Sequence, residues 1–132
     1  MPHIDWVLVA DLAYLDQRGR LCTVGVVTKL LVPSLPIVMR QIMVVARVSD
    51  PSPGEEIGIG VAVLTPTGQW AEPEDSDSVQ IEVAAEYLLV TLRDLPLTEE
   101  GTYQFAVYLD EQTMAVDVPV CLPTSRRYAE VH

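Results

Sequence analysis

Hydrophobic and polar residues alternate along most of the chain. The clearest run lies at 103–109, where every second residue is large and apolar. These residues are Tyr103, Phe105, Val107 and Leu109. A second alternating run at 114–120 follows a polar turn at 110–112. Two such runs joined by a short turn predict a β-hairpin.

The same period of two recurs in the rest of the sequence, and short segments rich in Pro, Gly and polar residues separate the runs. The other predicted strands cover residues 4–15, 20–32, 38–48, 57–64, 69–71, 79–83 and 88–93. No run has the length and the 3.6-residue period of a convincing amphipathic helix. Eight or nine short strands at regular turn spacing predict an all-β sandwich.

The first predicted strand is apolar on both faces. Trp6 and Leu8 fall on one face, and Val7 and Val9 fall on the other. We interpret residues 4–32 as an N-terminal β-hairpin, and its strands then need cover on two sides. A glycine in the middle of the second strand, Gly25, indicates a bulge or a close approach of another group to the backbone.

The start of the 103–109 strand, Gly101-Thr102-Tyr103, has two interpretations. It fits the tyrosine corner of immunoglobulin-like sandwiches, in which the hydroxyl bonds to backbone a few residues upstream. It fits equally well an ordinary core tyrosine after a glycine turn. Both interpretations give Tyr103 a structural role. The paired cysteines and the core tryptophan of a true immunoglobulin domain are missing, and Phe105 stands where the second cysteine would be.

Several turn signatures occur in order along nearly the whole chain. They are Ala10-Asp11, DQRGRL at 16–21, Val24-Gly25-Val26, Pro53-Gly54-Glu55, TPTG at 65–68 and Gly101-Thr102-Tyr103. With these signatures the chain resembles a family of small uncharacterised bacterial proteins, a domain of unknown function. The resemblance implies an immunoglobulin-like part at about 38–122 with the N-terminal hairpin as an addition, and it implies no activity, cofactor or site. We expect one domain at 1–122, followed by a polar tail at 123–132.

The composition narrows the range of partners and compartments. A formal net charge of −11 opposes binding to nucleic acid and to anionic membrane surfaces, and we interpret the acidity as a source of solubility. The chain starts without the basic region of a secretion signal and has no stretch of membrane-spanning length, so we expect a cytoplasmic protein. Cys22 and Cys121 are then expected to be buried or half-buried thiols. With only His3 and His132 as further ligands, they form no convincing zinc site.

One acidic segment offers oxygen ligands for a cation. It contains Glu72, Glu74, Asp75 and Asp77, of which the last three are the weak candidates for binding calcium. The segment lacks the ordered spacing of an EF-hand loop, and a run of charges is usually a solvated loop. Trp70, which lies close by in the sequence, is a candidate for stacking on a carbohydrate.

Asp11 and Asp16 are the carboxylate pair to consider for catalysis. Two carboxylates can act as general acid and base only when the fold holds them across one cleft. We favour a structural interpretation, in which Asp16 stabilises a turn and Asp11 pairs with Arg20 or Arg47.

The residues therefore favour a non-catalytic protein-interaction or structural module without a cofactor. We expect it to bind a protein partner or to self-associate as a homo-oligomer, through the N-terminal hairpin or an edge strand. The alternative is a calcium- or carbohydrate-binding module, and an enzyme is the least favoured reading. We expect Trp6, Asp11, Gly101, Tyr103 and Phe105 to be structural.

Overall fold

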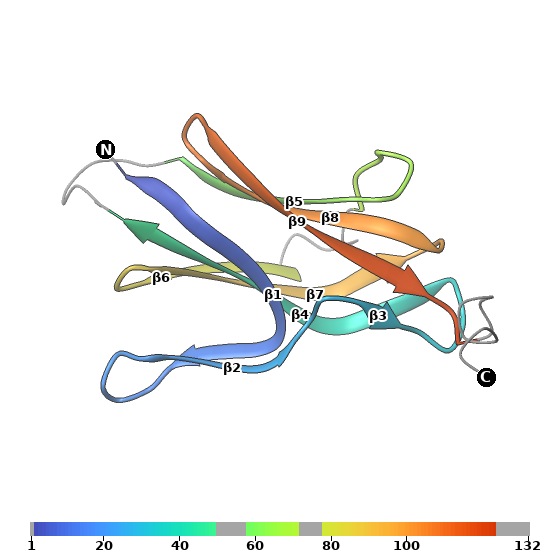
Figure 1. Ribbon diagram of the computed structural model, residues 1–132, viewed down its shortest axis with the longest axis horizontal. Coiled ribbons are helices and arrows are strands. Elements are labelled where there is room, and N and C mark those ends of the chain that lie inside the picture. Colours follow the sequence, from blue (N-terminus) through green and yellow to red (C-terminus); the bar gives the residue numbers. More distant parts are fainter. Residues whose placement is uncertain (1, 50–57, 72–77, 124–132) are drawn as a thin grey trace.

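The structure is a computed structural model that describes residues 2–49, 58–71 and 78–123. In these ranges the chain forms nine β-strands (Figure 1). Their bounds are β1 (His3–Leu15), β2 (Leu21–Val26), β3 (Leu30–Leu31), β4 (Ile37–Ser49), β5 (Ile59–Leu64), β6 (Val79–Ala84), β7 (Tyr87–Leu97), β8 (Gly101–Leu109) and β9 (Gln112–Cys121). Across the same ranges, no helix is long and apolar enough to cross a membrane.

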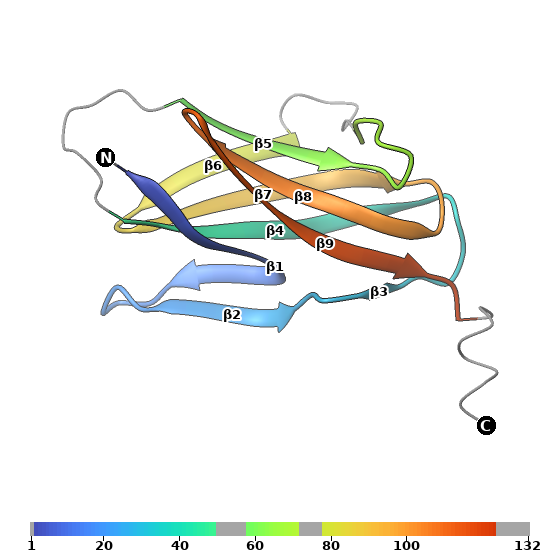
Figure 2. The same cartoon turned by 45° about the horizontal axis from the view of Figure 1, so that its top comes forward.

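The strands form two sheets that pack face to face (Figure 2). One sheet has the order β2-β1-β4-β7-β6, and the other has the order β3-β9-β8-β5. The chain passes from β4 to β5, back to β6 and β7, and then to β8 and β9. Splitting these strands between two sheets in this way is typical of an immunoglobulin-like sandwich. The predicted fold class is confirmed.

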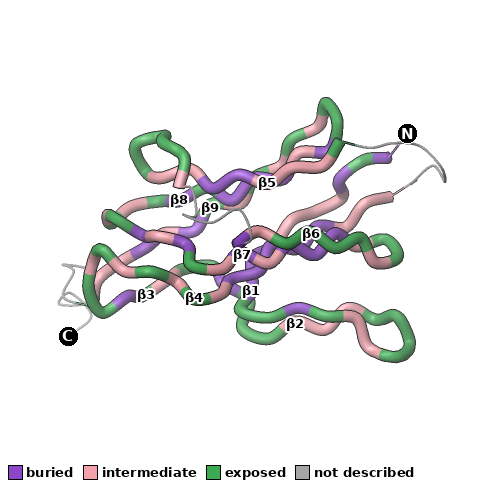
Figure 3. Tube along the Cα trace, turned by 180° about the vertical axis from the view of Figure 1, so that it is seen from behind, coloured by how far each residue is buried: buried purple, intermediate pink, exposed green. Residues whose placement is uncertain are grey.

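The core lies between the sheets and uses the faces that the alternation predicts. The side chains of Tyr103, Phe105 and Val107 on β8 have no exposed surface. Facing residues of β4 and β7 join them in one cluster, among them Ile42, Val44, Ala46, Leu88, Val90 and Leu92. Figure 3 shows this burial along the central strands, whereas β2 is half-buried or exposed throughout.

Tyr103 connects the start of β8 to the end of β7. Its hydroxyl oxygen accepts hydrogen bonds from the backbone N–H groups of Thr98 (2.9 Å) and Glu99 (3.3 Å). These are upstream backbone groups, so the arrangement is that of a tyrosine corner. Gly101 begins the same strand with a φ of +132°, and a Cβ at this position would lie 2.8 Å from the ring of Pro66. A glycine is required there for both conformation and space.

The first strand bends back on itself. A β-bulge between Ile4 and Trp6 shifts its register on β4, and the pairing with β4 ends at Ala10. The second half of β1 then turns back with β2 below β4, on the side away from β8 and β9 (Figure 1). There Ala13 and Leu21 pack against a second apolar cluster on the outer face of the sheet, formed mainly by Met43, Val45 and Leu89. The hairpin therefore supplies cover for a face that the second sheet cannot reach.

A tight turn at Asp16 closes this hairpin. The carboxylate oxygen Oδ1 of Asp16 accepts from the backbone N–H groups of Arg18 and Arg20, both at 2.9 Å. Its Oδ2 lies 2.7 Å from Nε of Arg20. The hydrogen bond from the Arg20 backbone is the main cause that lowers the pKa of this carboxyl, and the Arg20 side chain adds to it. Asp16 stabilises the turn, as predicted.

The predicted strand 20–32 is wrong in its extent. β2 ends at Val26, where the chain leaves the five-stranded sheet, and β3 pairs in parallel with β9 in the other sheet. Between the two strands, the N–H of Val27 donates to the carbonyl of Val9 at 2.7 Å. Gly25 precedes this crossing with a φ of +67°, which allows the chain to change direction.

Four other predictions on the chain course differ from the structure or fall outside the described residues. Residues 69–71 form only an isolated bridge, between Leu64 and Trp70, instead of a strand. His3 starts β1, one residue before the predicted strand at 4–15. The Pro53-Gly54-Glu55 signature and nearly all of the polar tail at 123–132 lie outside the described residues.

We expect Tyr103→Phe to lower the free energy of unfolding by about 1–2 kcal/mol, because two partly buried N–H groups lose their acceptor. Chemical denaturation measures this loss. Tyr108→Phe, at a half-buried position of the same strand, is the matched control and should change stability little. Equal stability of the two variants would contradict the role given to the corner.

We expect the NMR shifts of the Arg18 and Arg20 backbone amides to follow the titration of the Asp16 carboxyl. The apparent pKa of this titration should lie below 3.8, the ordinary value of the carboxyl. A carboxyl whose pKa is lower in the folded state stabilises the fold at pH values above its ordinary pKa. This stabilisation is lost as the pH falls through the lowered pKa of the folded state. NMR titration of the two amide shifts measures this. In Asp16→Asn the titration should vanish, and a midpoint at or above 3.8 in the original protein would refute the assignment.

Candidate functional site

The outward face of the hairpin is an exposed apolar surface. We call it the hairpin face, and it consists of Leu12 and Tyr14 on β1 with Val24 and Val26 on β2. Leu12 and Val24 are direct cross-strand partners, so their side chains lie side by side. The exposed fractions of these four side chains run from 42% to 54%. Apolar residues gathered in pairs on one small element are typical of a contact surface, whereas scattered ones are not.

A hollow of about 420 Å³ lies between the hairpin and the outer face of its sheet. Leu12 and Tyr14 are among its lining residues, so the hollow adjoins the hairpin face. Its wall is mixed in chemistry, with Met43 and Leu89 beside polar residues such as Arg93. The guanidinium of Arg93 already donates to the side-chain carbonyl of Gln80 at 2.7 Å.

The two carboxylates considered for catalysis, Asp11 and Asp16, lie at different places in the hairpin and make different contacts. Asp16 is engaged by its own turn, as described above. Asp11 is exposed, and its carboxylate lies over Gly25, where a Cβ would collide with it. The prediction that Asp11 pairs with Arg20 or Arg47 is wrong, because Arg20 pairs with Asp16 and Arg47 pairs with Asp5. Neither Asp11 nor Asp16 lines the hollow beside the hairpin.

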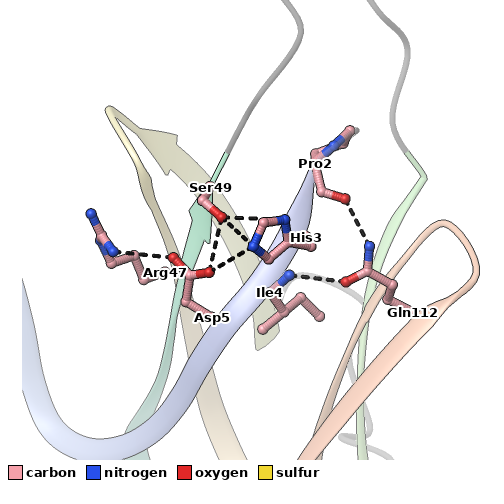
Figure 4. A network of polar contacts seen from close by, with 7 residues as sticks. All are labelled: Pro2, His3, Ile4, Asp5, Arg47, Ser49 and Gln112. Carbon is pink, nitrogen blue, oxygen red and sulfur yellow. Dashed lines mark hydrogen bonds and ion pairs between the residues drawn. The ribbon is translucent and has the colours of Figure 1, made fainter.

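A polar network that the sequence reasoning missed joins the start of β1 to the end of β4 (Figure 4). The hydroxyl of Ser49 lies 2.6 Å from Nε2 of His3 and donates to Oδ1 of Asp5 at 2.9 Å. The same Asp5 oxygen is 3.1 Å from Nε2 of His3, and its other oxygen is 3.1 Å from the Arg47 guanidinium. This network could have been predicted only from the pairing of His3 with Ser49. That pairing depends on the register of β1 on β4, which a bulge shifts.

This Ser, His and Asp grouping does not have the connectivity of a catalytic triad. In a triad, serine and aspartate bind opposite nitrogens of the imidazole, so that the histidine can take the serine proton. Here Nε2 of His3 is the nitrogen nearer to Ser49 and also the one that faces Asp5, whereas Nδ1 lies 3.3 Å from the Ser49 hydroxyl, and Ser49 also donates to Asp5 directly. Arg47 balances the charge of Asp5 in addition. The geometry is that of a surface network that fixes the first residues of β1 on β4.

A neighbouring contact holds the same stretch of β1 from the chain's other sheet. The side chain of Gln112, at the start of β9, accepts from the N–H of Ile4 at 3.0 Å and donates to the carbonyl of Pro2 at 2.7 Å (Figure 4). On the outer face, the rings of Trp6 and Tyr87 lie 6.1 Å apart, tilted by 46°. The start of β1 therefore contacts both sheets, and Trp6 packs as part of the outer cluster.

The other candidates are distributed as follows. Glu72, Glu74, Asp75 and Asp77 lie outside the described residues. Trp70 is 58% exposed on the loop after β5. Both cysteines are half-buried free thiols: Cys22 lies in the hairpin and Cys121 at the end of β9. Within the described ranges, no group of three or more His, Cys, Asp and Glu side chains could hold a metal ion.

Comparison with known proteins gives a family without an assigned function. No curated protein matches the chain. Among solved structures, the M1 domain from titin is similar with 16% identity and a TM-score of 0.35, over 66% of this chain and 82% of that chain. A family model described as a family of unknown function (DUF6941) matches residues 5–118. Because the match extends over most of the sequence, the chain belongs to this family of unknown function.

Proposed function

We propose that the protein is a non-catalytic protein-interaction module that self-associates through the hairpin face. The observation that carries this proposal is the pairing of exposed apolar side chains across β1 and β2, with Leu12 beside Val24. The opposite face of the hairpin packs on the sheet through Ala13 and Leu21. The element is therefore held in place from behind and presents its apolar side outward.

The local charge supports a second copy as the partner. The chain as a whole carries −11, so two copies repel each other at most surfaces. Residues 11–26 contain two acidic residues, Asp11 and Asp16, and two basic ones, Arg18 and Arg20. This stretch is therefore neutral, and two hairpins can approach without the repulsion that the rest of the chain would impose.

The proposed location is the cytoplasm. In support, Cys22 and Cys121 are free thiols on different sheets, which suits a reducing compartment. Half-burial of both thiols also agrees with a role in packing.

We expect the protein to form dimers as its concentration rises and Val24→Lys to weaken this association about tenfold or more, since a lysine would be buried without a partner. Light scattering during size-exclusion chromatography, run over a concentration series, measures the mass. The matched control is Ile81→Lys, an exposed apolar position on β6, which should leave the dimer intact. A monomer at every concentration, or an equal loss in both variants, would rule the proposal out.

A further inference from the structure

Among the described strands, none lies beside β5 to cover β6, so one side of the sandwich is open there. β6 lies at the edge of the larger sheet, and its Val79, Ile81 and Val83 pair with Leu92, Val90 and Leu88 on β7. Those β7 residues belong to the core between the sheets, so their partners on β6 also point inward. Nevertheless Ile81 is 43% exposed and Val83 is 66% exposed. The inward face of β6 lacks the cover that a further strand beside β5 would give.

The edge of β5 presents backbone groups to this open side. On that edge, the carbonyl of Val63 accepts from the N–H of Ala71 at 2.8 Å. In an antiparallel strand, every second residue directs both its N–H and its C=O to the same edge. The backbone N–H and C=O groups of Ile59 and Val61 therefore point to the same edge as those of Val63. The backbone groups of Gly60 and Ala62 point to β8 instead. Beyond the short bridge at Leu64, no residue that the structure describes pairs with this edge of β5, and such an edge is one that a β-sheet extends by adding a strand.

Two apolar hollows lie along the same opening, one toward each end of β5. The larger has a volume of about 190 Å³ and is lined by residues of both sheets, including Val61, Trp70 and Val79. The smaller has a volume of about 60 Å³ and lies beside Ile59 and Val83. Hollows spaced along a free edge are what alternate side chains of an added strand would fill.

We propose that β5 accepts an extended segment of another protein as an additional strand, pairing with the backbone of Ile59 and Val61. Apolar residues at every second position of that segment cover Ile81 and Val83 and enter the two hollows. This surface is distinct from the hairpin face, so the proposal goes beyond self-association.

Charge identifies the kind of segment that fits. In the sequence, residues 50–57 precede β5 and carry Asp50, Glu55 and Glu56, while residues 72–77 precede β6 and carry four more carboxylates. An incoming strand flanked by Lys or Arg therefore complements the acidic stretches that precede β5 and β6 in the sequence, whereas the β5 edge of a second copy would bring the same acidic stretches with it. The two acidic stretches of the chain itself also lack the alternating apolar residues that would cover β6.

The probe for this site is a synthetic peptide in which Val and Thr alternate between pairs of Lys. We expect its binding to slow hydrogen exchange at the Ile59 and Val61 amides, while Gly60 and Ala62 stay protected by β8 with and without peptide. Trp70 lines the larger hollow, so its fluorescence should shift as well. A peptide N-methylated on its pairing edge loses the donors for this ladder and should bind about tenfold more weakly or worse.

Two protein variants separate this site from the hairpin face. Ile81→Lys should weaken peptide binding about tenfold or more, and Val24→Lys should leave it unchanged, which is the reverse of their effects on the dimer. If the peptide does not bind while the protein still forms its dimer, the strand-addition proposal fails and the proposed self-association is unaffected.

Three outcomes would overturn the proposal. The first is unchanged exchange at Ile59 and Val61 on adding peptide, or equal binding of the N-methylated peptide. The second is protection of these amides that grows with protein concentration and disappears in Ile81→Lys, since a second copy would then occupy the edge. The third is protection without peptide at every concentration, since another segment of the same chain would then cover it.

Discussion

The structure depends on the need to cover apolar side chains on both faces of β4 and β7. Ile42, Val44 and Val90 point to one face, and Met43, Val45 and Leu89 point to the other. A two-layer sandwich covers only the first set. The second set would remain in water if β1 continued straight along β4, because no strand of the smaller sheet reaches that side. Folding β1 back after Ala10 places Ala13 and Leu21 over it. The hairpin is therefore part of how the domain excludes water, although the turn that closes it lies on the surface.

Local features at the two ends of β1 make this bend possible. The bulge at the start places both Ile4 and Val7 toward the core, which a regular strand could not do. At the other end, Gly25 leaves room for the Asp11 carboxylate at the point where the strand has separated from β4. The bond from Val27 to Val9 then directs the chain to the opposite sheet. Each device is a departure from regular pairing, and each occurs where one strand changes its neighbours.

The sequence was sufficient for features that depend on near neighbours. Alternation placed Tyr103, Phe105 and Val107 in the core. The role of Asp16 in its turn could be predicted because its hydrogen-bond partners lie within four residues. Features set by distant pairing were not accessible. The His3–Ser49 contact joins residues 46 positions apart across a bulged register. The break after Val26 depends on which sheet offers a partner, and a run of valines and leucines carries no such information. Apolar residues on both faces of the first strand indicated that something must cover them, but not that the same strand would do so.

Local charge, more than net charge, decides what the uncovered surfaces can bind. A value of −11 for the whole chain suggests repulsion from any acidic partner, including another copy. Screening at physiological salt limits such repulsion between exposed charges to about 8 Å, so a contact responds mainly to the residues within and beside it. The hairpin, with equal numbers of Asp and Arg, is compatible with its own copy. The opening at β5 and β6 adjoins segments that are strongly acidic in sequence, and it favours a basic strand. As proposed, the two exposed apolar surfaces of this small domain select different partners through the charges that lie beside them.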